Sequence, residues 1–186
     1  MGHSQAEKTQ NRDRILEAAA AQIRAGGLES VSVAALMKTV GLTHGGFYGH
    51  FASRYDLLGQ ALERALLDGE GRARAAAPGA ARPSFATSVR SYLSRAHRDA
   101  PETGCAIAAL VSDVGRADAE SRAVMERHIE GFIASMSDRL GGEDEAAAIE
   151  AVCAMVGALA ISRVVTDPKR SDAILRAVQG RLMAER

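Results

Sequence analysis

Side chains that donate hydrogen bonds are concentrated between Ser32 and Arg54, where hydroxyls, imidazoles and two cations alternate with glycines. Such groups suit contacts to phosphate oxygens and to base edges, because Ser, Thr, Tyr, His and Arg all donate protons to those acceptors. No catalytic motif accompanies them: the sequence has no P-loop, dinucleotide fingerprint, Ser-His-Asp order or metal-ligand spacing. We therefore expect a nucleic-acid contact here, no enzymatic activity, and no cofactor or metal.

Two short helices within residues 32–51 would position these donors. Ser32 can cap the first helix, and Gly41 permits a tight turn after it. The second helix begins at Thr43 and turns two aromatic residues inward, one helical turn apart: Phe47 and Phe51. A longer preceding helix braces the pair through an apolar stripe. The pattern predicts a helix-turn-helix, whose second helix lies in the major groove of DNA.

This stretch resembles the N-terminal domain of the tetracycline-repressor (TetR) family over roughly residues 10–60. The matching elements are in register: Arg-x-x-Ile-Leu from Arg12, Val-Gly-Leu-Thr from Val40, Phe-Tyr-x-His-Phe from Phe47, then Ser53-Arg54 and Leu57-Leu58. Beyond residue 60 the resemblance extends to length, helix count and helix order. A softer match, from Gly104 to Leu110 with Asp113, resembles a regulatory-domain pattern found in some family members.

The resemblance implies separate roles for the donors. The residues at positions that touch the DNA backbone are Ser32, Thr43, Tyr48, His50 and Arg54, and those at positions that face the bases are His44, Gly45, Gly46 and Gly49. The family usually carries Lys, Arg or a larger polar residue at the base-facing positions. His44 is therefore the main candidate for direct readout, and DNA shape should carry more of the specificity. Each glycine costs a helix about 1 kcal/mol relative to alanine, which predicts a recognition helix that orders on DNA.

The composition favours helices throughout. Hydrophobic residues make up 47% of the 186-residue chain, aromatic residues only 4%, and no tryptophan is present. Alanine-rich sequences poor in β-branched and aromatic residues favour close-packed helices over strands. The net charge is zero, with an excess of two positive charges through Arg54 and of two negative charges beyond it. That asymmetry has the sign expected of an N-terminal DNA-binding domain.

Hydrophobic periodicity and cap residues predict an all-α chain of about nine helices. The fourth helix should run from Ser53 to fray near Gly69 and Gly71, and a break should follow at residues 78–83. The later helices are expected over residues 84–96, over residues 105–114, after Asp118, after Gly141-Gly142 (apolar from Ile149 to Ile161) and from a cap at Ser171. We expect a DNA-binding domain over residues 1–54 and a regulatory, ligand-binding and dimerisation domain over residues 55–186.

The family resemblance implies a homodimeric, ligand-responsive repressor that binds a pseudo-palindromic operator. The eighth helix is apolar almost all round, and Ala154, Gly157, Ala158 and Ala160 allow close approach, so this helix and the ninth should form the dimer interface. A small, mostly apolar effector is expected between the middle helices. Its expected contacts are Tyr92, Leu110, Met125, His128, Phe132 and Met155.

Several of these residues have a second interpretation. His50 can pack or cap instead of touching a phosphate, and His128 can be a satisfied core residue instead of an effector contact. The methionines can simply fill the core. Cys105 and Cys153 suit small buried hydrophobes, or a thiol-based redox or electrophile sensor on the same fold. A helical adaptor that binds only proteins, without DNA, is the remaining alternative class.

The sequence predicts a cytoplasmic protein without a membrane span. The N-terminal residues are polar and charged, unlike a signal peptide. The longest apolar run, Ala151 to Ile161, is shorter than the roughly 20 residues that a membrane-spanning helix needs.

Overall fold

The computed structural model describes residues 5–75 and 83–184, and every regular element within these ranges is helical. The elements are α1 (Gln5–Gly26), η1 (Leu28–Ser30), α2 (Val33–Thr39), η2 (His44–Gly49), α3 (Arg54–Ala75), α4 (Phe85–Tyr92), α5 (Arg95–Asp99), η3 (Pro101–Thr103), α6 (Ala106–Val114), α7 (Ala119–Arg139), α8 (Glu145–Val164) and α9 (Pro168–Ala184), where η marks a 3₁₀ helix. The predicted all-α class is confirmed.

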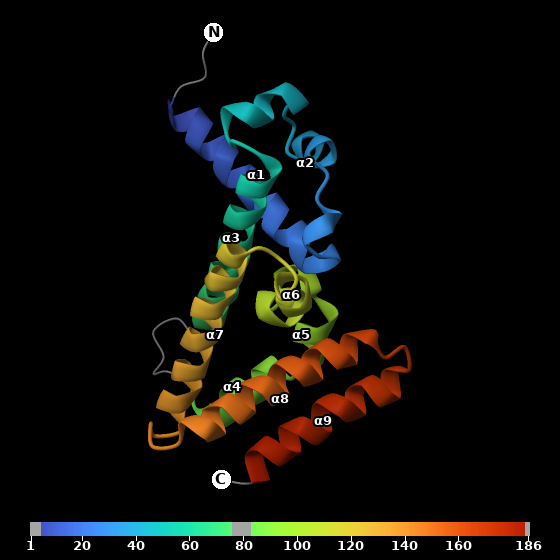
Figure 1. Ribbon diagram of the computed structural model, residues 1–186. Coiled ribbons are helices and arrows are strands. Elements are labelled where there is room, and N and C mark those ends of the chain that lie inside the picture. Colours follow the sequence, from blue (N-terminus) through green and yellow to red (C-terminus); the bar gives the residue numbers. More distant parts are fainter. Residues whose placement is uncertain (1–4, 76–82, 185–186) are drawn as a thin grey trace.

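The helices form an elongated subunit with the N-terminal elements at one end and the C-terminal pair at the other (Figure 1). α1, α2 and η2 lie at the first end. α3 and α7 run side by side along the molecule and join its two ends, and α6 lies beside them below the C-terminal end of α1. α8 and α9 pack against each other as an antiparallel pair at the far end.

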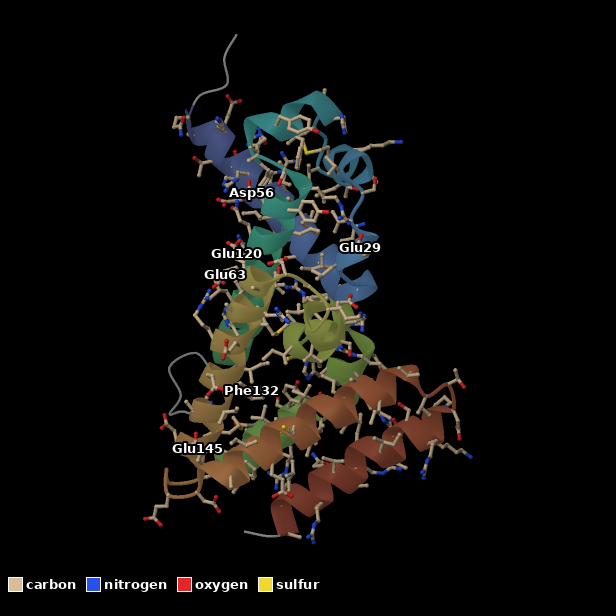
Figure 2. The ribbon with its side chains drawn as sticks, viewed as in Figure 1. Glu29, Asp56, Glu63, Glu120, Phe132 and Glu145 are labelled. Atoms are coloured by element: carbon tan, nitrogen blue, oxygen red, sulfur yellow. The ribbon has the colours of Figure 1, made fainter. Side chains whose placement is uncertain are left out.

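Two hydrophobic cores fill these ends. The upper core joins α1, α2, η2, α3, α6 and the first half of α7, and its fully buried members include Ile15, Ile23, Leu36, Phe47, Phe51, Leu57 and Leu110. The lower core joins α4, the second half of α7, α8 and α9 around Val89, Met136, Val152, Met155 and Leu175. Phe132 packs against both cores from α7 (Figure 2). α3 begins directly after the helix-turn-helix, and the upper core contains residues of both.

Local signals in the sequence set several helix ends as predicted. The side chain of Asp118 accepts a hydrogen bond from Ser121 N at 2.8 Å, and Ser84 accepts one from Thr87 N at 3.2 Å. Each side chain satisfies an amide that has no partner within its helix. Gly141 and Gly142 end α7 at φ of 94° and 77°, where a side chain would be strained.

Three predicted helices differ from the structure. The helix expected over residues 84–96 is two helices, because Ser94 adopts an extended ψ of 155° and its side chain caps α5 through His97 N. α9 begins at Pro168, whose missing N–H and fixed φ suit a first helical position, so Ser171 is not its cap. α3 continues through Gly69 and Gly71 to Ala75. Most of the break expected at residues 78–83 lies outside the described residues.

α8 is the one helix in the described ranges with the length and apolar composition to cross a membrane, a test that core helices of soluble proteins also pass. Its inner face packs against α7 and α9 and contributes Ala148, Ala151, Val152, Met155, Ala158 and Leu159 to the protein interior. Its apolar character is therefore at least partly explained by packing within the subunit.

Candidate DNA-binding and regulatory sites

The turn between α2 and η2 is built by backbone hydrogen bonds around one glycine. Gly41 has a φ of 72°, and the amide of the next residue, Leu42, donates to Met37 O at 2.8 Å. Phe47 and Phe51 are buried and stacked, with ring centroids 5.6 Å apart. These contacts confirm the inward positions that their spacing predicted. The turn and the two buried rings together fix the orientation of η2 relative to α2.

Two arginines of α1 hold the helix-turn-helix against the rest of the subunit. Arg12 Nη1 donates to the carbonyl of His50 at 2.6 Å, Nη2 donates to Gln60, and the guanidinium lies 4.6 Å from the Phe51 ring centroid. Arg14 Nη2 donates to the carbonyl of Val40 at 2.6 Å. The sequence motif identified Arg12, but it gave no role to Arg14, whose partner is 26 residues away.

η2 is a 3₁₀ helix of six residues in place of the expected α-helix. Thr43 caps it, since its hydroxyl oxygen accepts from Gly46 N at 3.3 Å, and the same amide also donates to Thr43 O. Short 3₁₀ segments are common where helix propensity is poor, and half of this element is glycine. The Thr43 hydroxyl keeps its proton for donation to another group.

Six of the predicted DNA contacts are exposed: Ser32 directly before α2, and Thr43, His44, Gly45, Tyr48 and Gly49 on η2 or at its start. Tyr48 is 70% exposed although its ring edge packs against Phe47. Lys38 in the last turn of α2 is exposed as well and was missed by sequence reasoning. Its signal was available, because cations on a helix-turn-helix often meet phosphates.

The glycines of η2 are not required by its packing. A Cβ added at Gly45 or Gly49 would meet no atom within 4 Å, and neither residue has a positive φ. At Gly46 the nearest atom would lie 3.5 Å away, which is an ordinary contact. The missing side chains therefore leave an accessible backbone at the surface, the arrangement that lets a main chain approach a ligand closely.

Arg54 and His50 are less available than the other predicted contacts. Arg54 Nε donates to Val31 O at 3.2 Å, and Nη2 pairs with Glu29 at 3.0 Å. The Glu29 side chain is 90% exposed (Figure 2), so this ion pair contributes little to stability. His50 is half-buried beside Phe51, and its carbonyl is held by Arg12.

Two charged residues, Arg24 and Asp113, connect the C-terminal end of α1 to the rest of the subunit by hydrogen bonds. The sequence pattern predicted no such role for either residue. Arg24 is 3% exposed and donates to Glu102 O at 2.6 Å and to Ala65 O at 3.2 Å. Asp113 of α6 accepts from Leu28 N at 3.1 Å. Gly27 has a φ of 83°, and a Cβ there would meet Asp113 at 2.5 Å. α1, α3, α6 and η3 are thus joined at one point.

The six predicted effector contacts lie along the boundary of the two cores. Leu110 and Met125 belong to the upper core and Met155 to the lower core, whereas Phe132 touches both. His128 is 9% exposed, with Nε2 3.2 Å from Glu63. Neither of the two hollows described for this part of the chain brings them together: a hollow of about 210 Å³ touches only Met125, and a cleft of about 590 Å³ touches none of them.

Tyr92 stands out among these residues because its hydroxyl is buried and makes no hydrogen bond in the part of the chain that the structure describes. Its ring lies 5.6 Å from Phe132 and 4.7 Å from His97. Burial, and after it the neighbouring Cys105 thiol, raise the pKa of Tyr92 well above its usual value, so the hydroxyl keeps its proton. The Cys105 thiol beside it is only a weak acceptor, so the hydroxyl is a proton donor without a strong acceptor in the described part of the chain.

His97 connects this region to the start of α6. Its Nδ1 lies 2.7 Å from Tyr92 O, and its Nε2 accepts from Cys105 N at 2.9 Å. A carbonyl can only accept, so Nδ1 carries the proton and the ring is neutral. Burial, and to a lesser extent the nearby Arg163, lower the pKa of His97, whereas its hydrogen bond to Tyr92 O opposes this shift. Acid would place a second proton on Nε2 and break the bond to Cys105.

We expect His97 to make the subunit less stable in acid. A histidine with a lowered pKa in the folded state takes up its proton more readily when unfolded, so stability falls as pH drops below about 6.5, by up to about 1.4 kcal/mol per pH unit. His97→Gln removes this titration. Urea unfolding between pH 7 and pH 5 should show a flatter dependence for His97→Gln than for the wild-type protein. Equal slopes in the two proteins would contradict the assignment.

Comparison with known proteins agrees with this architecture. Residues 15–61 match the family described as bacterial regulatory proteins, tetR family. No curated protein matches the sequence. Solved structures match nearly the whole chain. The reduced form of E. coli NemR is 18% identical with a TM-score of 0.75, covering 93% of this chain and 95% of NemR. A TetR-family regulator from Cytophaga hutchinsonii is 16% identical with a TM-score of 0.76, covering 98% of both chains.

A third structure holds both kinds of partner expected here. AibR in complex with isovaleryl coenzyme A and operator DNA is 16% identical, has a TM-score of 0.64, and matches over 92% of this chain and 97% of its own. The helix-turn-helix at one end and the helical bundle at the other define a DNA-binding transcription regulator. Residues 15–61 therefore resemble the N-terminal domain of the TetR family of bacterial regulatory proteins, and the chain as a whole shares the fold of TetR-family structures.

Proposed function

We propose that this regulator is a cytoplasmic homodimeric repressor that binds a pseudo-palindromic operator and leaves it when a small, mostly apolar effector binds. The observation that carries the proposal is the surface of η2. Exposed hydrogen-bond donors lie there next to accessible main chain at the glycines, and Arg12 and Arg14 fix the position of the element. The exposed donors of this surface are free to meet phosphate oxygens and base edges.

The roles proposed for the DNA contacts follow from their exposure. Tyr48, Ser32 and Thr43 would donate hydroxyl protons to phosphates, and His44 would donate to a base acceptor in the major groove. The backbone at Gly45, Gly46 and Gly49 would approach the bases closely. Arg54 would exchange its weak pair with Glu29 for a phosphate, and His50 would bind the backbone from the end of η2. Residues 1–54 would form the DNA-binding domain, and residues 55–186 the regulatory domain.

The outer faces of α8 and α9 support a dimer built from these two helices. Ile161 and Val164 of α8 are 56% and 79% exposed, and Ile149 is also exposed on this helix. Small residues follow one another at helical spacing on α9: Ala173, Ala177, Gly180 and Ala184. Exposed apolar side chains beside small residues suit close packing against a two-fold mate. The two recognition elements would then meet half-sites about 34–36 Å apart.

The boundary between the two cores is the proposed effector site. Its apolar walls would be Leu110, Met125, Phe132 and Met155, with His128 at the edge. The Tyr92 hydroxyl would donate to the effector, since a buried polar group without a partner costs about 1–3 kcal/mol. Opening this boundary would change the packing of α6 and α7, which also contact α3. An effector that favours the opened form would lower operator affinity.

A thiol sensor on the same fold is the second candidate. Cys105 is half-buried, and its thiol lies close enough to the Tyr92 hydroxyl and Arg163 to affect both electrostatically, whereas Cys153 is exposed. N-ethylmaleimide should then release wild-type protein from its operator. Cys105→Ser should resist this release, and Cys153→Ser should not. Release that is unaffected by either substitution excludes both thiols.

The function as a whole is tested by selecting fragments of genomic DNA with the purified protein. We expect enrichment of one pseudo-palindromic sequence, bound by two subunits, with an affinity that falls steeply as salt rises. Protein that binds no DNA at low salt would contradict the proposal and favour a helical adaptor. A small-molecule screen for operator release then tests regulation separately.

His44→Ala should relax the preference for one base in each half-site, at a cost of about 1–3 kcal/mol on the preferred operator. Its effect on nonspecific DNA should be small. Tyr48→Phe is the contrasting variant: loss of a phosphate contact should weaken specific and nonspecific binding alike. Selection of randomised half-sites with both variants measures the difference. An unchanged preferred sequence in His44→Ala would show that His44 does not read a base.

A further inference from the structure

A cleft of about 590 Å³ opens where the end of α1 meets α6 and the turn between α8 and α9. Three arginines line it, Arg24, Arg98 and Arg163, with Asp99 as the sole acidic residue of its lining. The remaining lining is a mixture of small apolar and hydroxyl residues, which includes Ala25, Ala108, Ala109, Ala160, Ser162 and Thr166. The lining therefore combines three cationic side chains with small apolar residues.

Two of the three arginines are neutralised within the subunit. Arg98 pairs with Asp172 at 2.8 Å and with Asp99 at 2.6 Å. Arg24 lies 3.6 Å from Asp68 and is otherwise bound by backbone carbonyls. Neither one needs a further anion.

Arg163 has no such partner. Its Nε donates to Arg98 O at 3.1 Å and its Nη2 to His97 O at 3.0 Å, both neutral carbonyls at the end of α5. Within the described residues no carboxylate forms an ion pair with it, and no group accepts a hydrogen bond from Nη1. Burial lowers its pKa, and the more distant charges of Cys105, Tyr92 and Glu102 oppose this shift. A partly desolvated cation without a direct ion pair is costly to maintain.

The Arg163 guanidinium is also held in a fixed position. Two hydrogen bonds anchor it to α5, and it packs so closely on Gly104 that a Cβ there would lie 2.7 Å from Nη2. Little side-chain entropy remains to be lost when an anion binds, and a guanidinium is well suited to carboxylate oxygens.

We infer that this cleft binds a small carboxylate with an apolar body, whose charge pairs with Arg163 and whose body lies on the alanines. None of the six residues proposed for the effector site lines this cleft, although Arg163 also lies near Tyr92 of that site. Its wall includes Ala25 of α1 and the exposed Val164 of α8, so it touches both the brace of the helix-turn-helix and the proposed dimer face. Binding of the carboxylate to the cleft does not depend on the proposed function. Any effect of the bound carboxylate on operator affinity does rest on the proposed function.

Calorimetric titration of the full chain with benzoate tests the inference, with benzamide as a neutral compound of the same shape and ionic strength held constant with sodium chloride. We expect benzoate to bind at least tenfold more tightly than benzamide, and Arg163→Gln to abolish that difference. Equal affinity for the two compounds, or no binding of benzoate, overturns the inference. Tighter binding of inorganic phosphate than of benzoate would overturn the assignment to a carboxylate.

A second pair of variants keeps the test valid if Arg163→Gln fails to fold. Thr166 is exposed at the rim of the cleft, so Thr166→Glu places a carboxylate beside Arg163, and Thr166→Gln adds a neutral side chain of the same size. Thr166→Glu should weaken benzoate binding at least tenfold relative to Thr166→Gln. Equal affinities would overturn the inference. All titrations are done without DNA, so failure to bind an operator would refute the proposed function and leave the carboxylate site standing.

Discussion

Gly157→Leu should give a folded subunit that no longer dimerises and has lost roughly 100-fold or more of its operator affinity. A Cβ at this position meets no atom of the same subunit within 4 Å, so the fold has room for a larger side chain. In the proposed dimer the helices approach closely here, and two-fold symmetry applies the overpacking on both sides of the contact. A monomer engages one half-site and loses the gain in affinity, about 10²–10⁴-fold, that linked binding provides.

The measurements are mass by sedimentation equilibrium, helicity by circular dichroism, and operator affinity. Gly131→Leu is the matched control, because Gly131 lies in the middle of α7, is exposed and also has open space around its Cβ. It should remain a dimer with normal DNA affinity. A stable dimer of Gly157→Leu would show that α8 does not form the interface at this point. Loss of helicity would show that residue 157 packs inside the subunit.

Arg12→Gln should lower operator affinity at least tenfold, although the residue lies on α1, outside the recognition element. The substitution removes two hydrogen bonds, to His50 O and to Gln60, together with the contact on the Phe51 ring. Hydrogen bonds to charged groups contribute about 1.5–3 kcal/mol each, so we expect the free energy of unfolding to fall by about 2 kcal/mol or more. The end of η2 then loses the contacts that set its orientation.

Thermal unfolding and operator binding at several salt concentrations separate orientation from direct charge contact. Loss of orientation lowers affinity without changing the number of phosphates neutralised, so the salt dependence should stay the same. Arg116→Gln is the control, since the Arg116 side chain is 73% exposed and pairs only with Asp113 three residues earlier. It should change neither property appreciably. A shallower salt dependence in Arg12→Gln would show that Arg12 itself binds a phosphate.

Features that depend on neighbouring residues could be read from the sequence. The turn at Gly41, the inward positions of Phe47 and Phe51, and the caps at Ser84 and Asp118 all follow from residues within one or two helical turns of each other. Backbone geometry alone relates such residues, so their types and spacing suffice. The resemblance to the TetR family rested on the same short stretch, and the family match confirms it.

Features that depend on distant partners were decided by the tertiary structure. Arg12 meets Gln60 across 48 residues, Arg24 meets Glu102 across 78, and Leu28 meets Asp113 across 85. Nothing in the local pattern distinguishes these charged residues from solvated ones. The burial of the Tyr92 hydroxyl and the lack of an ion pair at Arg163, within the described residues, likewise depend on surroundings that several helices form together. The burial of a side chain and its ion pairs depend on tertiary packing. Packing brings together segments that are far apart in the sequence, and the local sequence pattern does not show which segments these are.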